Sequence, residues 1–88
     1  MNTLPGSNLV DEGLEDLRLR RETVPALLVS IGHPRLRSLG IEVPEPFSDP
    51  EMRLYLMLAA TEGDAAHSRY NALVRRLVSF ERALACAR

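Results

Sequence analysis

The sequence predicts an all-α protein: a small bundle of four to five helices in which a long C-terminal helix runs antiparallel to a central apolar helix. Two observations support this fold class. Apolar residues recur with the period of a helix over several segments, and no segment alternates in the manner of a half-buried strand. A chain of 88 residues has the size of one domain. We therefore expect a single helical domain over 1–88, with 1–7 as a flexible N-terminus.

The first part of the chain carries an apolar stripe on one side of a helix. Projected at about 100° per residue, this stripe consists of Val10, Leu14, Leu17, Arg21, Val24, Leu28 and Ile31. Pro25 complicates a continuous helix, because proline lacks an N–H and crowds the carbonyl group one turn earlier. Either one helix over 8–31 kinks at Pro25, or Thr23 caps a new helix with Pro25 in its first turn. We favour the break, although the unbroken stripe argues for continuity.

The middle of the chain contains short elements and turns. A Gly-His-Pro sequence at 32–34 predicts a helix stop, and a short helical turn over 34–39 is expected to end at Gly40. Two prolines within 41–47 favour an extended, solvated loop. The sequence Ser-Asp-Pro-Glu at 48–51 then predicts a capping box, with its serine as the N-cap of the next helix.

Two longer helices complete the prediction. A helix is expected over 50–61, and its residues 52–60 are apolar on nearly every side except at Arg53. Such a helix is normally central to a core or covered by a partner. After a tight turn at 62–64, a final helix is expected over 65–85. Its apolar arc consists of Ala66, Tyr70, Leu73, Val74, Leu77, Phe80 and Leu84. This helix is about 30 Å long, which is more than its shorter neighbour can cover.

The charge balance and the single cysteine limit the classes of partner and compartment. Eleven basic and twelve acidic residues give a net charge of -1, so the overall field attracts neither nucleic acid nor an anionic membrane. Cys86 cannot form an intramolecular disulfide. The apolar stretches are shorter than the roughly 20 residues that span a bilayer, and the first residues do not resemble a signal peptide. We expect a cytoplasmic protein without a membrane anchor.

Residues suited to catalysis are few. His33, His67 and Cys86 do not have the spacing of metal ligands, and the sequence contains neither a Gly-rich phosphate loop nor a nucleophile elbow. The paired acids at 11–12 and 15–16 fit a solvated helix start better than acid–base chemistry. We therefore predict no enzymatic activity, no metal and no cofactor.

Two charged residues interrupt the apolar stripes. Arg21 lies in the stripe of the first helix and Glu81 in that of the last, and neither has an opposite charge one turn away on its own helix. An unpaired charge on a buried face is costly. One hypothesis is therefore an inter-helix ion pair between Arg21 and Glu81. The alternative is that both side chains reach water at the edges of their stripes.

The excess of apolar helix predicts a protein-binding module, either a homodimer or a regulatory or adaptor subunit with a heterologous partner. A chain of this size has difficulty covering two such helices. The candidate contacts are Leu54, Tyr55, Leu58, Tyr70, Leu77, Phe80 and Leu84, with Arg69 and Arg76 along one edge and Arg75 and Arg82 on the opposite face. For any single apolar member of this set, a place in the core of the chain itself is the stronger interpretation.

The alternative function is DNA binding by a helix-turn-helix. The helix over 50–60, the turn at Gly63 and the helix over 65–85 would place Arg69, Arg75 and Arg76 toward a major groove. The net charge argues against this function because it provides little attraction to phosphate.

Overall fold

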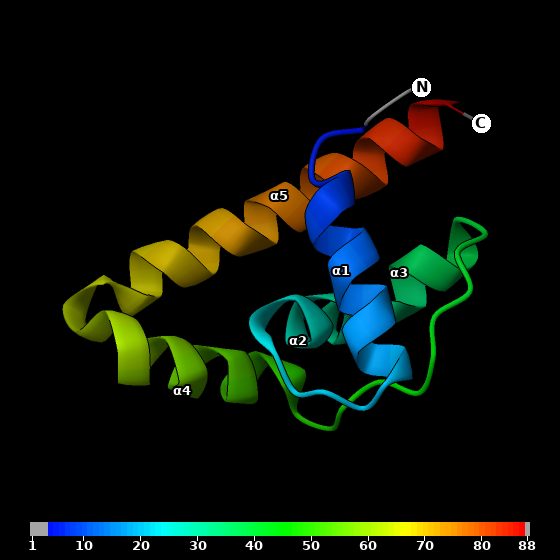
Figure 1. Cartoon of the computed structure of the whole chain (residues 1–88). Coiled ribbons are helices and arrows are strands. Elements are labelled where there is room, and N and C mark those ends of the chain that lie inside the picture. The colour runs from blue at the N-terminus through cyan, green and yellow to red at the C-terminus, as the bar shows by residue number, and fades with distance from the viewer. Residues whose placement is uncertain (1–3, 88) are drawn as a thin grey trace.

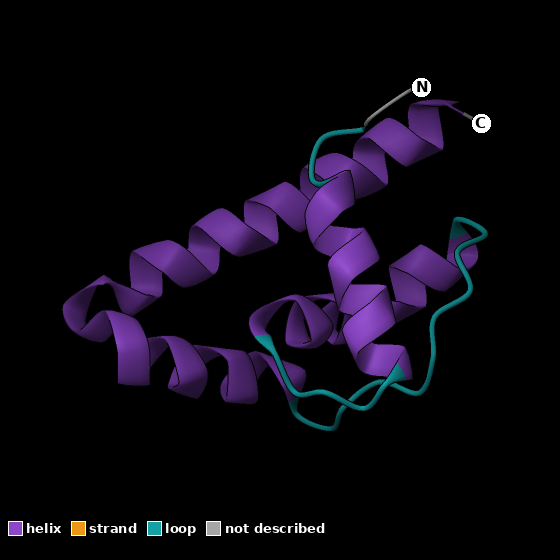
Figure 2. Ribbon diagram, viewed as in Figure 1, coloured by secondary structure: helices purple, strands orange, loops and turns teal. Residues whose placement is uncertain are grey.

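The computed structural model describes residues 4–87. In chain order its elements are α1 (Ser7–Arg18), α2 (Val24–Ile31), α3 (His33–Ser38), α4 (Pro50–Glu62), the short 3₁₀ turn η1 (Gly63–Ala65) and α5 (Ala66–Ala87). The described residues contain helices and loops but no strand (Figure 2). The all-α prediction is therefore confirmed.

The helices are arranged around α2. Figure 1 shows α2 between α4 and α5, with α1 crossing it and α3 continuing from its end. α4 and α5 meet at η1 and diverge from there, so that they form two sides of an open hairpin. The molecule measures 38 × 24 × 21 Å, and α5 extends along its greatest length (Figure 1).

The central helix is α2 rather than the longer apolar helix α4. Ala26, Leu27, Leu28 and Val29 are all fully buried, and Ser30 is nearly so. The Ser30 hydroxyl donates to the carbonyl oxygen of Ala26 at 2.9 Å, so its polar group is satisfied inside the core. A short helix with no charged side chain can thus be enclosed on all sides.

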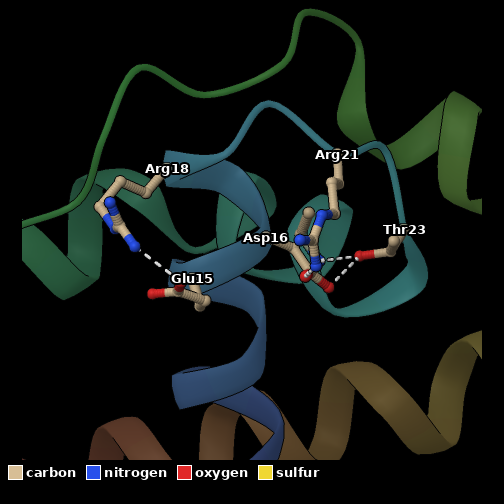
Figure 3. Close-up of polar contacts among 6 residues, drawn as sticks. Glu15, Asp16, Arg18, Arg21 and Thr23 are labelled. Atoms are coloured by element: carbon tan, nitrogen blue, oxygen red, sulfur yellow. Dashed lines mark hydrogen bonds and ion pairs between the residues drawn. The ribbon is translucent and has the colours of Figure 1, made fainter.

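The chain breaks between α1 and α2, as the Thr23 cap predicts. The Ala26 N–H donates to Thr23 Oγ1 at 3.2 Å, and Pro25 occupies the first turn. Thr23 Oγ1 also donates to Asp16 Oδ2 at 2.7 Å, and Arg21 contacts Asp16 Oδ1 at 3.5 Å. Figure 3 shows these side chains converging on Asp16, which is only 7% exposed. This network joins the last turn of α1 to the first turn of α2.

The backbones of α1 and α2 approach each other closely at Gly13. A Cβ atom at this position would lie against the carbonyl oxygen of Pro25 and 2.8 Å from Val29 Cγ1. At the start of α1, a Cβ atom on Gly6 would lie 2.8 Å from the Arg76 carbonyl oxygen of α5. Two glycines therefore let α1 pack on α2 and α5 without intervening side chains.

The proline-containing loop is held against the helices instead of being fully solvated. Arg20 donates to the Glu45 carbonyl oxygen at 2.6 Å, and its guanidinium lies 4.5 Å from the centre of the Phe47 ring. The Phe47 N–H donates to Ser30 Oγ at 3.1 Å. Because the side chains of Ile41, Val43 and Phe47 also pack on the core, the loop covers part of α2.

Two local predictions need correction. α4 begins at Pro50 as expected, but its N-cap is Asp49, which has a φ of 48° and makes no side-chain cap hydrogen bond. Ser48 Oγ instead accepts from Arg53 at 3.4 Å, so the capping box does not form. Of the expected flexible segment, 1–3 lie outside the described residues. Leu4 packs against the core, and Ser7 already belongs to α1.

The close crossing at Gly13 predicts the sign of a stability change. At an open helix position, alanine is more stable than glycine by up to about 1 kcal/mol. We expect Gly13→Ala to lower the free energy of unfolding instead, by about 1–3 kcal/mol, because the added methyl group overpacks the crossing. Urea denaturation measures the change. The exposed neighbour provides a control, since Glu12→Ala is expected to change stability by less than about 0.5 kcal/mol. A stabilised Gly13→Ala variant would contradict the close approach.

Candidate protein-binding surface

The helix α4 has two apolar sides, and residues 4–87 cover only one of them. Leu54 and Leu58 point inward and are at most 3% exposed. On the other side, Met52 is 66%, Leu56 61% and Tyr55 42% exposed. Ala59 and Ala60 are exposed as well. We call the five residues Met52, Tyr55, Leu56, Ala59 and Ala60 the outer stripe.

The outer stripe has the spacing of a helix-packing face. Starting from Met52, its members follow at positions i+3, i+4, i+7 and i+8, which is the pattern of one apolar side of a helix. The stripe extends over about 12 Å of the helix axis. It contains no charged residue, and its largest side chains are two aliphatic groups and one aromatic ring. Such a continuous uncharged side normally packs against another helix.

Tyr55 of the outer stripe contacts Tyr70 of α5. The rings of Tyr55 and Tyr70 meet edge to face, with centroids 6.2 Å apart. Burial, and to a lesser extent the negative charge of Glu51, raises the pKa of Tyr70 above its ordinary value. Tyr55 is therefore positioned by its neighbour on α5 while part of its ring stays in water.

Four acidic residues flank the outer stripe along the chain, two before it and two after it. Asp49 and Glu51 stand at the N-terminal end of α4, and Glu62 and Asp64 at its C-terminal end. All four are exposed, and none takes part in an ion pair with another of residues 4–87. We call the four acids Asp49, Glu51, Glu62 and Asp64 the acidic border. Arg53, the one base of α4, already has an acidic partner, because it contacts Glu22 at 3.0 Å.

The structure separates the predicted contact residues into three groups by their exposure. Four of them belong to the core of the chain itself, namely Leu54, Leu58, Leu77 and Phe80, so they are not available to a partner in this conformation. Tyr70 and Leu84 are partly buried against the same core. The exposed members are Tyr55 and the four arginines Arg69, Arg75, Arg76 and Arg82.

The sequence prediction missed four members of the outer stripe: Met52, Leu56, Ala59 and Ala60. Their spacing was a usable signal, because it lies opposite a second stripe that contains Leu54 and Leu58. What the sequence did not indicate was which of the two stripes faces the core. That choice depends on where α2 lies.

The hypothesis of an ion pair between Arg21 and Glu81 is wrong. Arg21 follows the end of α1, contacts Asp16 and has a side chain 63% exposed. Glu81 lies on α5 beside Gly32, where a Cβ atom would be 3.1 Å from its Oε2. The break after α1 takes Arg21 off the continuous stripe that the hypothesis assumed. Within the described chain, Glu81 takes part in no ion pair.

Burial shifts the protonation equilibrium of Glu81. The residue is 9% exposed, and desolvation raises its pKa, an effect that the positive charge of Arg35 partly offsets. The folded protein therefore favours the protonated carboxyl group more than the unfolded chain does.

The surface of the described part of the chain contains no pocket. No three His, Cys, Asp or Glu side chains among residues 4–87 are grouped so as to hold a metal ion. Nor does this region contain a helix with the length and apolar character needed to cross a membrane.

Comparisons with models of protein families, with curated proteins and with solved structures find no match to this chain. The function is therefore inferred from the geometry and the charges of α4 and its surroundings.

The raised pKa of Glu81 predicts a pH-dependent stability. Its favourable contribution is complete below the ordinary glutamate pKa of about 4.3 and is lost as the pH rises through the higher pKa of the folded state. We expect Glu81→Gln to be more stable than the parent chain at neutral pH and the difference to shrink toward pH 4. Urea denaturation across this range measures it, with the exposed Glu12→Gln as the control. A less stable Glu81→Gln variant at neutral pH would show that attraction to Arg35 outweighs desolvation.

Proposed function

We propose that this chain is a non-enzymatic, cytoplasmic protein-binding module that contacts its partner through the outer stripe of α4. One observation carries the proposal: five apolar residues with helical spacing lie on the solvent side of a helix whose other side is fully packed. The role that fits such a small module is that of a regulatory or adaptor subunit.

The energetic reason lies in the largest side chains of the outer stripe. Fully burying a leucine or methionine side chain is worth about 1.5–3 kcal/mol. Met52 and Leu56 keep well over half of their accessible surface, so a partner that covers them recovers much of this free energy. Tyrosine is also common among the residues that dominate binding energies, and Tyr55 stands beside them.

Helix-turn-helix DNA binding is the alternative function. It is favoured by the exposure of Arg69, Arg75, Arg76 and Arg82 on α5. It has less support than protein binding because these basic side chains belong to a chain with a net charge of -1, and phosphate contacts supply most of the affinity of DNA-binding proteins. DNA binding also gives the outer stripe no role.

The proposed function predicts that polar residues in the outer stripe abolish partner binding without unfolding the protein. The double change Met52→Gln and Leu56→Gln removes two apolar side chains, and glutamine has nearly the helix propensity of the residues it replaces. We expect a stability change of less than about 1 kcal/mol. Proteins recovered with the tagged parent chain from cells of its source are expected to be lost with the variant, as measured by quantitative mass spectrometry.

Two control variants make this experiment specific. Arg75→Gln and Arg82→Gln together change two exposed residues of α5 and are expected to leave protein recovery intact. Leu54→Ala removes a buried leucine of α4 and is expected to lower stability by about 2–5 kcal/mol. The proposal fails if the double variant of the outer stripe recovers the same proteins as the parent chain. A salt-sensitive mobility shift of duplex DNA that only the arginine changes reduce would favour the alternative.

A further inference from the structure

We infer that the partner of the outer stripe is a basic amphipathic helix, with an apolar side for the stripe and Arg or Lys residues for the acidic border. This inference rests on the proposed function and adds the chemistry of the partner. It is carried by the juxtaposition of an uncharged apolar stripe with four exposed acids at its two ends that form no ion pair within residues 4–87.

The apolar part of the surface fits a helix. The outer stripe extends over about 12 Å along α4, from Met52 to Ala60. A second helix packed on it would place its own apolar residues between those of α4, as ridges into grooves. The small Ala59 and Ala60 side chains at one end permit a close approach there.

The charge of the partner follows from the acidic border. Asp49 and Glu51 border one end of the stripe, and Glu62 and Asp64 the other. Arg53, the base of α4, is engaged by Glu22 at 3.0 Å. A partner with bases at the rim of its apolar side would meet four acids that have no ion pair within residues 4–87. An acidic partner would meet repulsion at both ends, and complementary rim charges raise both specificity and association rate.

A second copy of the chain is a poorer occupant. Packing two outer stripes together would bring a second set of the same four acids to the interface, while Arg53 of each copy is already paired. The apolar area is also small. Stable interfaces bury about 800 Å² on each partner, whereas this surface is a single stripe about 12 Å long. We therefore expect the isolated chain to be a monomer and the basic helix to bind with modest affinity.

Two synthetic peptides test the charge of the partner. Both are fluorescently labelled 18-residue helices with leucine at i, i+3, i+4, i+7, i+8 and i+11, and they differ only in carrying arginine or glutamate at the flanking positions. Fluorescence anisotropy with the full chain measures their dissociation constants. We expect the arginine peptide to bind roughly tenfold more tightly than the glutamate peptide, and the preference to weaken with salt.

Matched variants locate the source of the preference. Glu51→Gln with Glu62→Gln is expected to reduce the preference for the arginine peptide to less than about threefold. Glu12→Gln with Glu42→Gln removes the same net charge from exposed positions outside α4 and is expected to leave the preference unchanged. Met52→Gln with Leu56→Gln is expected to weaken the binding of both peptides.

The outcomes separate this inference from the proposed function. Equal binding of the two peptides, or binding of neither, overturns the inference that the partner is a basic helix. A stable dimer in sedimentation velocity that dissociates in the Met52→Gln and Leu56→Gln double variant overturns it as well. The proposed function stands in those cases if the same double variant loses the proteins that the parent chain recovers from cells. If recovery is unchanged, the proposed function fails, whatever the peptides show.

Discussion

Enclosure of α2 on all sides is the constraint on which the other helices depend. This helix has no charged residue, and its only hydroxyl group is bonded to its own backbone and to the loop that covers it. α1 approaches it at Gly13, α4 contributes Leu54 and Leu58, and α5 contributes Leu73 and Leu77 to the same core. α2 is only eight residues long, and it packs against the side of α4 that carries Leu54 and Leu58.

The polar contacts of the chain support this arrangement. Asp16 joins the end of α1 to the cap of α2 through Thr23, and Arg20 holds the loop over α2 through Glu45 and Phe47. Both contacts fix segments that would be free to move without them. With the loop packed on α2 and α1 packed on α2 and α5, the described chain covers only the inner side of α4. The exposed outer stripe is thus a consequence of how the core is closed.

Local chemistry made some features predictable, whereas tertiary packing decided others. The Thr23 cap and the stop before α3 follow from residues close in sequence, and the structure has both. The position of α4 does not, because its two apolar stripes are nearly equivalent in sequence and only the place of α2 distinguishes them. Leu54 and Leu58 were candidates both for an interface and for the core, and they lie in the core, while Met52 and Leu56 lie outside. The Arg21 and Glu81 hypothesis failed for a related reason, since it assumed one continuous stripe across the break after α1.

The exposure of α4 in solution is the most direct test of this account. Methyl NMR signals of the dilute chain can be recorded with a soluble gadolinium chelate, which broadens the signals of methyl groups that water reaches. The account predicts strong broadening for Met52 and Leu56 and little for Leu54 and Leu58. Equal protection of all four residues would contradict it, because the outer stripe would then be covered by the chain itself or by a second copy.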